Sequence, residues 1–176
     1  MKRLIMILAV LMTAAALPAQ IGAELGARQS VVLVEDSPFA PALQLFSELD
    51  LGVLIPFDLW AISLGTGVGY LSPSAVTSDG VIYRGVIARS LWLRTQVALS
   101  DSFAAAASFR ANLGEYVLTP LLFFYPEIRL SLDYLAQPET GAPVVVHAWG
   151  GYQFRQDLSF AMIFGIGTRV QLVLSD

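Results

Sequence analysis

The sequence predicts an all-β protein, an eight-stranded antiparallel up-and-down transmembrane β-barrel. The first observation is a two-residue periodicity over residues 158–174, where large apolar residues and one threonine alternate with residues that are mostly small or polar. Successive side chains of a strand point to opposite faces, so the two faces of this segment meet different surroundings. The second observation is the composition: 14% of the residues are charged and 56% are hydrophobic, against about 25% charged in soluble domains. The apolar face is therefore expected outside, against lipid.

Seven segments carry this alternation. Their ranges are 43–55, 60–70, 81–99, 103–113, 121–135, 144–155 and 158–174. An eighth strand is expected at residues 28–36, centred on Val31–Val34, because an even number of strands returns both ends of the chain to one side of the membrane. Which face of this eighth strand points inward stays open. Pro126 has no backbone N–H to donate, so it predicts a bulge or a register break in its strand.

Aromatic residues mark the expected boundaries of the apolar outer face, since Trp and Tyr rings prefer the interface between lipid and water. The predicted interface residues are Trp60, Tyr70, Phe124, Tyr134, Tyr152 and Phe154. Arg89 has the parity of the apolar face, where a charge near the centre of a membrane is costly. We therefore expect Arg89 in a part of its strand that extends beyond the lipid.

The opposite face combines small residues with charges of both signs. The predicted inward charges are Glu48, Asp50, Arg94, Arg110, Glu127, Arg129, Asp133, Arg155 and Arg169. An eight-stranded barrel is so narrow that side chains fill it, and unpaired charges there would be costly. A structural ion-pair network is the favoured interpretation, because the planar guanidinium of arginine can bridge two acids. The alternative is a constriction of Arg94, Arg110, Glu127 and Arg169 that opens for small solutes.

Five aromatic residues also point inward by parity. They are Phe46, Trp92, Phe123, Tyr125 and Trp149. Packing of the interior is favoured for them, since buried aromatic rings mostly serve packing. A pocket for a hydrophobic compound is the alternative. The single histidine, His147, is expected to form a hydrogen bond inside the barrel, because one isolated histidine makes neither a metal site nor a recognisable catalytic set.

The first residues have the pattern of an export signal. Lys2 and Arg3 precede an uncharged apolar run over residues 4–17, followed by a small-residue site after Ala19. We expect a signal peptide at residues 1–19 and a barrel over 20–176, with cleavage after Ala23 as the second choice. A retained anchor is disfavoured because a spanning helix needs about 20 apolar residues.

Several function classes find no support in the residues. The chain has no cysteine, which excludes disulfides, thiolate metal sites and a lipid-modified cysteine. Its formal net charge of −4 disfavours nucleic acid as a partner. Gly65, Gly67 and Gly69 lack the spacing of a nucleotide-binding fingerprint. Glu48 and Asp50 share a face and could carry acid–base chemistry, but no substrate pocket is evident for them. We expect no enzyme, no metal and no cofactor.

A soluble barrel of the lipocalin type would also show alternating strands. Its outward face would be the charged one, whereas the polar face here is sparse and rich in Gly, Ala and Ser. Such a face suits a crowded, narrow interior better than a wetted exterior. The membrane barrel is therefore the favoured interpretation.

In its periodicity and strand count the chain resembles the small bacterial outer-membrane β-barrels, the class that includes the OmpA membrane domain and the OmpX and OmpW types. The resemblance covers essentially the whole chain after residue 19 and carries no motif that selects one family. The chain departs from the class at its end, Leu172–Asp176, where these barrels commonly finish on an aromatic residue.

This resemblance implies a monomer exported to the bacterial outer membrane, surrounded by its lipids, with a side-chain-filled lumen and a structural or surface-interaction role. The external loops are candidates for contact with an extracellular ligand. A narrow channel for small or hydrophobic solutes is the second hypothesis. A lipid-modifying enzyme is the third, and it is disfavoured because no serine follows His147 at the spacing found in the outer-membrane deacylases.

Overall fold

The structure is a computed structural model of the 176-residue chain. It describes residues 21–34, 42–57, 59–75, 82–83, 85–117, 119–136, 142–154 and 160–173. The predicted signal peptide, residues 1–19, lies outside the described residues, as does Arg155. Among the described residues, no helix is long and apolar enough to cross a membrane.

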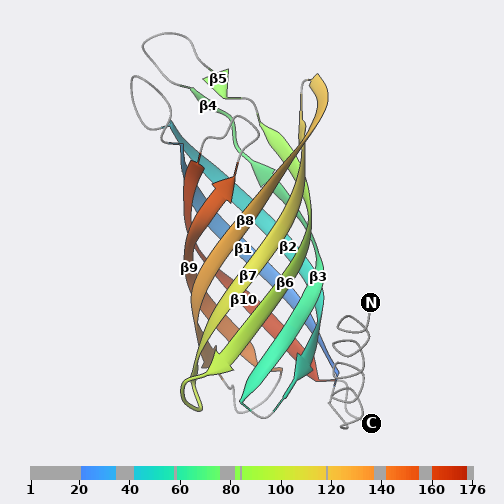
Figure 1. The fold of residues 1–176 in the computed structure, drawn as a ribbon, viewed down its shortest axis with the longest axis vertical. Coiled ribbons are helices and arrows are strands. Elements are labelled where there is room, and N and C mark those ends of the chain that lie inside the picture. The colour runs from blue at the N-terminus through green and yellow to red at the C-terminus, as the bar shows by residue number, and fades with distance from the viewer. Residues whose placement is uncertain are drawn as a thin grey trace, which may run out of the picture.

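Eight strands close into a barrel in which every neighbour is antiparallel (Figure 1). The barrel strands are β1 (Gly22–Val34), β2 (Ala42–Pro56), β3 (Trp60–Leu71), β6 (Val86–Ala98), β7 (Phe103–Tyr116), β8 (Thr119–Ala136), β9 (Val144–Phe154) and β10 (Phe160–Val173). Each strand pairs with the next along the chain, and β1 closes the barrel by pairing with β10. The predicted eight-stranded up-and-down barrel is confirmed.

A two-stranded sheet of β4 (Ser74–Ala75) and β5 (Ile82–Tyr83) lies within the connection from β3 to β6. It occupies the upper end of the barrel in Figure 1. Gly22 of β1 pairs with Val173 of β10 at the opposite, lower end. The short connections 57–59 and 99–102 are also at this lower end.

The pairing register fixes the dimensions of the barrel. A ladder that starts at Tyr70 crosses all the other strands in turn and returns to β3 at Trp60, ten residues earlier in the same strand. With a rise of about 3.3 Å per residue and about 4.8 Å between strands, this displacement gives a strand tilt of about 40° and a radius of about 8 Å. Such a barrel is just wide enough for its own side chains.

The strands form because their two faces are so different. On β6, burial alternates residue by residue from Val86 to Arg94, which is the signature of a strand with one face in a packed interior. The outward side chains are large and apolar, and Leu91, Leu130 and Ile166 are each at least 65% exposed. An exposed apolar surface of this extent fits lipid and not water.

Three details of the prediction were wrong. The expected strand over residues 81–99 is divided, because Ile82–Tyr83 is β5 of the separate two-stranded sheet and the barrel strand begins at Val86. The first strand begins at Gly22, six residues before the expected start, and the residues 35 and 36 lie outside the described residues. Pro126 causes no register break, because its pair with Ala111 continues the β7–β8 ladder without a shift. The ladder between β8 and β9 begins one residue later, at Glu127, so Pro126 lies beyond its last pair. The irregularity of β8 occurs instead opposite Glu115 and Tyr116.

Candidate functional site in the barrel interior

Two groups of charged side chains fill the middle and the lower part of the lumen. The central cluster consists of Arg28, Glu48, Asp50, Arg110, Glu127 and Arg129. The lower cluster consists of Glu24, Arg94, Asp133 and Arg169. All ten side chains come from inward positions of six strands, β1, β2, β6, β7, β8 and β10.

Arg110 joins the two acids of β2. Its Nη2 donates to Asp50 Oδ1 at 2.7 Å and lies 3.0 Å from Glu48 Oε1. The same nitrogen donates to Ser90 Oγ at 2.7 Å. Arg28 approaches Asp50 from β1 as a second ion pair. The Arg110 guanidinium, 1% exposed, is therefore held by oxygen atoms of three side chains from β2 and β6, the two strands on either side of β3.

Arg129 closes the other half of the central cluster. Its Nη1 donates to Glu48 Oε2 at 2.8 Å, and its Nη2 donates to Glu127 Oε2 at 2.5 Å. Gln153 of β9 donates to the second oxygen of Glu127 at 2.5 Å. The Trp149 ring lies beside this pair, with its centroid 5.5 Å from the guanidinium carbon of Arg129, within the range of a cation–π contact.

In the lower cluster two arginines share one acid. Asp133 Oδ2 accepts from Arg169 Nη2 at 2.8 Å and also forms an ion pair with Arg94. Ser131 donates to the other oxygen of Asp133 at 3.0 Å. Arg169 Nε lies 3.7 Å from Glu24 Oε1, close enough for an ion pair and too far for a hydrogen bond.

Each cluster balances its charges. The central cluster has three arginines against three acids, and the lower cluster has two against two. Buried charges are tolerated only when they are paired and hydrogen-bonded. Among the described residues, no group of three or more His, Cys, Asp or Glu could hold a metal ion, and nearly all of the inward acids face arginines. The arrangement is suited to holding strands together.

An apolar layer closes the lumen above the central cluster. Its buried members are Val32, Phe46, Leu71, Val86, Ala88, Tyr125, Ala161 and Ile163, with Tyr116 and Phe123 packed against them. Val32, Ala161 and Ile163 are fully buried. Phe123 also contacts Tyr116, with ring centroids 4.8 Å apart. These side chains pack together across the upper part of the lumen.

Inward glycines make room for the large side chains. A Cβ added at Gly52 or Gly65 would lie 2.5–2.6 Å from atoms of the Trp92 ring. A Cβ at Gly67 would lie 2.9 Å from Ser90 Oγ and 3.0 Å from Arg110 Nη2. Gly65 and Gly67 are therefore structural, because they let the Trp92 ring and the Arg110 guanidinium approach the backbone of β3 closely.

The structure places eight of the nine predicted lumen charges inside the barrel, all 7% exposed or less; Arg155 lies outside the described residues. Sequence reasoning missed Glu24 and Arg28, which β1 contributes to the two clusters. Phe46, Trp92, Tyr125 and Trp149 are buried as expected, and Phe123 is half-buried. His147 is buried with its ring 5.2 Å from that of Trp149, but its Nδ1 has no hydrogen-bond partner among the described residues.

The predicted interface aromatics point outward and lie in two belts. Trp60 and Tyr134 are near the lower end, and Tyr134 packs on Phe103 at 5.2 Å. Tyr70, Phe124 and Tyr152 are near the upper end and about half exposed, while Phe154 is half-buried. From the strand tilt, Trp60 and Tyr70 are about 25 Å apart along the barrel axis, which matches the apolar band of outer-membrane barrels.

Arg89 and Glu115 form the charged exception on the outer surface. They lie on neighbouring strands near the upper end, 3.7 Å apart, and Arg89 is 66% exposed. Arg89 pairs in register with Val68, two residues below Tyr70. Its side chain therefore begins at the upper aromatic belt and extends toward Glu115, which β7 places above that belt.

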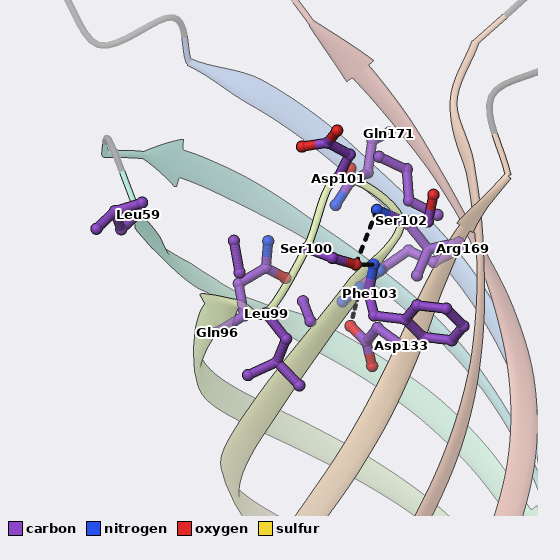
Figure 2. Close-up of a pocket in the computed structure, with 14 residues that line it drawn as sticks. Leu59, Gln96, Leu99, Ser100, Asp101, Ser102, Phe103, Asp133, Arg169 and Gln171 are labelled. Carbon is purple, nitrogen blue, oxygen red and sulfur yellow. Dashed lines mark hydrogen bonds and ion pairs between the residues drawn. The ribbon is translucent and has the colours of Figure 1, made fainter.

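A cavity of about 460 Å³ opens at the lower end, and we call it the vestibule. Figure 2 shows the turn of Ser100 to Phe103 beside the vestibule, with Asp133 and Arg169 at its inner side. Its remaining polar lining includes Gln96 and Gln171. The vestibule thus reaches inward as far as the lower cluster.

The comparison with solved structures identifies the fold. The barrel superposes on neisserial surface protein A with a TM-score of 0.57, 9% sequence identity, and coverage of 86% of this chain and 97% of the other. The chain has the fold of the small outer-membrane β-barrels. Ail, the attachment invasion locus protein of Yersinia pestis, matches this barrel with a TM-score of 0.50 and 10% identity over 88% of this chain and 99% of Ail. No family model and no curated protein sequence matches the chain.

Proposed function

We propose that this protein is an integral protein of the bacterial outer membrane with a closed lumen, and that its role is structural or in surface interaction. The observation that carries the proposal is the continuous filling of the lumen. Arg110, Glu127 and Arg129 are at most 2% exposed at mid-height, and the apolar layer covers them from above. To pass through the barrel, a solute would have to separate the hydrogen-bonded side chains of the central cluster and then the packed side chains of the apolar layer.

The outer surface supports the location. Two aromatic belts about 25 Å apart border a face that is apolar around most of the barrel, as in proteins of the outer membrane. Gln29 and Ser47, which are hydrogen-bonded to each other, are an exposed polar pair on this face. The longest connection, residues 72–85 between β3 and β6, is at the upper end, and the three connections at the lower end, 57–59, 99–102 and 137–143, are all shorter. Since such barrels have short periplasmic turns and longer external loops, the upper end faces the outside of the cell in this proposal.

The chain has no cysteine, so single-cysteine variants test the closed lumen directly. Asn112 is fully buried beside Tyr125, between the central cluster and the apolar layer, whereas Gln96 lines the vestibule. In proteoliposomes, a charged maleimide should label Gln96→Cys and leave Asn112→Cys unlabelled until the barrel is unfolded. Labelling of both variants at similar rates in the folded barrel would refute the closed lumen.

A second measurement addresses passage and location separately. Proteoliposomes that contain the wild-type barrel should take up arabinose no faster than protein-free liposomes, with an open porin as the positive control. Uptake well above that of the protein-free liposomes would favour the narrow channel instead. In cells, the protein should be recovered in the outer-membrane fraction and should change its gel mobility on boiling. Recovery in a soluble fraction would contradict the location whatever the uptake result.

A further inference from the structure

Strand β8 has an open edge above the upper aromatic belt. Its ladder with β7 continues up to Thr119, whereas its ladder with β9 ends at Glu127. The chain of β9 turns back into β10 just above this point, because Phe154 pairs with Phe160. Figure 1 shows the upper part of β8 extending beyond the end of β9. Among the described residues, β8 therefore has a neighbouring strand on only one side from Thr119 to Pro126.

The ladder with β7 fixes which backbone groups reach this edge. Leu135 N donates to Ser102 O at 2.8 Å, so Leu135 turns its backbone N–H and C=O toward β7. In an antiparallel pair this direction alternates residue by residue, and the β7–β8 register has no shift from Tyr134 up to Leu122. The even-numbered residues Leu122 and Phe124 therefore turn their N–H and C=O groups away from β7, toward the open edge.

Two prolines limit the open edge to a short window, residues 121–125. Pro126 is also even-numbered and has no backbone N–H for β9, which fits the end of the β8–β9 ladder. Pro120 has no N–H at the other end of the window. Leu122 and Phe124 are therefore the two edge-facing donors between them. Natural proteins guard sheet edges with proline, and the segment between these two prolines is left available for a further strand.

The side chains of the window are apolar or aromatic on both faces. Leu122 and Phe124 point outward and are 55% and 49% exposed. On the inner face, Phe123 lies between Tyr116 and Tyr125, with ring centroids 4.8 and 5.4 Å away. Side chains on neighbouring strands pack against each other directly. A strand that pairs here therefore needs uncharged residues on both of its faces.

The position of the window decides which chain can reach it. The ladder from Tyr70 through Ile87 and Glu115 meets Leu122, and each step rises about 3 Å, so the window extends about 9 Å above the belt. Two copies of the barrel side by side in one membrane would bring their β8 strands together at about 80°, twice the strand tilt. Paired strands are rotated by only about 20–25°. A second copy in the same membrane therefore cannot supply the strand.

We infer that the window of β8 binds an extended, uncharged segment of another protein, which adds to the barrel as a short strand above the membrane. The N–H groups of Leu122 and Phe124 donate to the segment, and their C=O groups accept from it. Its side chains lie beside Leu122 and Phe124 on the outer face and beside Phe123 on the inner face. The inference rests on the proposed orientation, in which the upper end faces the outside of the cell.

The first test measures amide hydrogen exchange by NMR on the refolded full-length barrel in detergent micelles. The amides of Leu122 and Phe124 should exchange at least about tenfold faster than those of Phe123 and Tyr125, which face β7. Leu130 is even-numbered too, but it pairs with β9, so its amide should exchange slowly. Equally slow exchange at Leu122 and Phe124 would show that the edge is covered and would overturn the inference.

The second test adds a probe, the capped peptide Thr-Val-Thr-Val-Thr. Its control is the same peptide N-methylated at the three central residues, which keeps the side chains but lacks donors along both edges. The unmethylated peptide should slow exchange at Leu122 and Phe124 saturably, by at least about tenfold, and the methylated peptide should not. Equal binding of the two peptides would mean that the window is only an apolar surface for lipid. That result, or no protection by either peptide, would refute strand addition.

Two substitutions at one position locate the pairing. Leu122→Pro removes an edge donor and leaves the ladder to β7 intact, whereas Leu122→Val keeps the donor. Only Leu122→Pro should weaken the protection of Phe124 by the peptide, by at least about tenfold, and equal binding by the two folded variants would contradict the inference. If Leu122→Pro does not fold, the two peptides on the wild-type barrel still decide. A negative result with the purified barrel leaves the proposed location and the closed lumen to their own tests.

Discussion

Replacement of Arg110 by Met tests whether charge balance holds the barrel together. Arg110 is 1% exposed and contacts Glu48, Asp50 and Ser90. Without it, the central cluster keeps three acids against two arginines, Arg28 and Arg129. Removal of one partner from a buried ion pair costs about 3–5 kcal/mol. Arg110→Met should therefore lower the free energy of unfolding by this amount, since methionine fills much of the volume but supplies no charge.

The double variant Glu48→Gln, Arg110→Met separates charge from packing, because it leaves Arg28 paired with Asp50 and Arg129 paired with Glu127. It restores two acids against two arginines, so the remaining loss should be about 1–2 kcal/mol, from hydrogen bonds to neutral partners. Reversible urea unfolding in phospholipid vesicles, followed by tryptophan fluorescence, measures each value. The control is Arg89→Met. This change removes the exposed ion pair between Arg89 and Glu115, 3.7 Å apart, and should lower the free energy of unfolding by less than about 1 kcal/mol. The reasoning fails if Arg110→Met lowers the free energy of unfolding no more than Arg89→Met does, or if adding Glu48→Gln to Arg110→Met restores none of the loss.

Three further changes test packing, depth and the strand edge. Gly65→Val should abolish the folded band that shifts on boiling, because an added Cβ meets a neighbouring backbone and an indole ring within 2.6 Å, whereas Leu64→Val on the lipid face should keep this band. Leu130 is 65% exposed and lies midway between the belts, so Leu130→Arg should lower the free energy of unfolding in urea by about 2–4 kcal/mol. Leu122→Arg, above the upper belt, should lower it by only about 0–1 kcal/mol. Equal losses in the two variants would contradict the placement in the membrane. Pro126→Val should change the unfolding free energy by less than about 1 kcal/mol, because the β8–β9 ladder begins one residue later, and a larger loss would show that the proline shapes the strand.

The alternation of side chains predicted most of the fold because lipid and the packed lumen select such different residues. The starts of β3 at Trp60 and of β7 at Phe103 could be read directly from the sequence. The start of β1 could not, since Gly26 and Ala27 are small on both faces and weaken the pattern. One signal was available there: Glu24, Gly26, Arg28 and Ser30 are polar or small and share one parity, which the structure places inside.

The pairing within the clusters could not be predicted from the sequence. Arg129 meets Glu48 across 81 positions of the chain, and this contact depends on the register of every strand between them. Parity assigns a side chain to the lumen but does not give its height, so it cannot tell which arginine meets which acid. The vestibule escaped prediction for the same reason, because it depends on which inward side chains are short at the same level.

The register of the barrel also determines the membrane it fits. A ladder that leaves Tyr70 returns at Trp60, so ten residues of β3 span the apolar band at the tilt that this closure imposes. If the register of one strand pair shifted by two residues, another pair would have to shift by two residues in the opposite direction. Otherwise the tilt of all eight strands would change. The vertical distance between the aromatic belts would then change by about 2 Å, a mismatch that the bilayer would have to absorb by thinning or thickening. The thickness of the bilayer therefore constrains the register of every strand pair in the barrel.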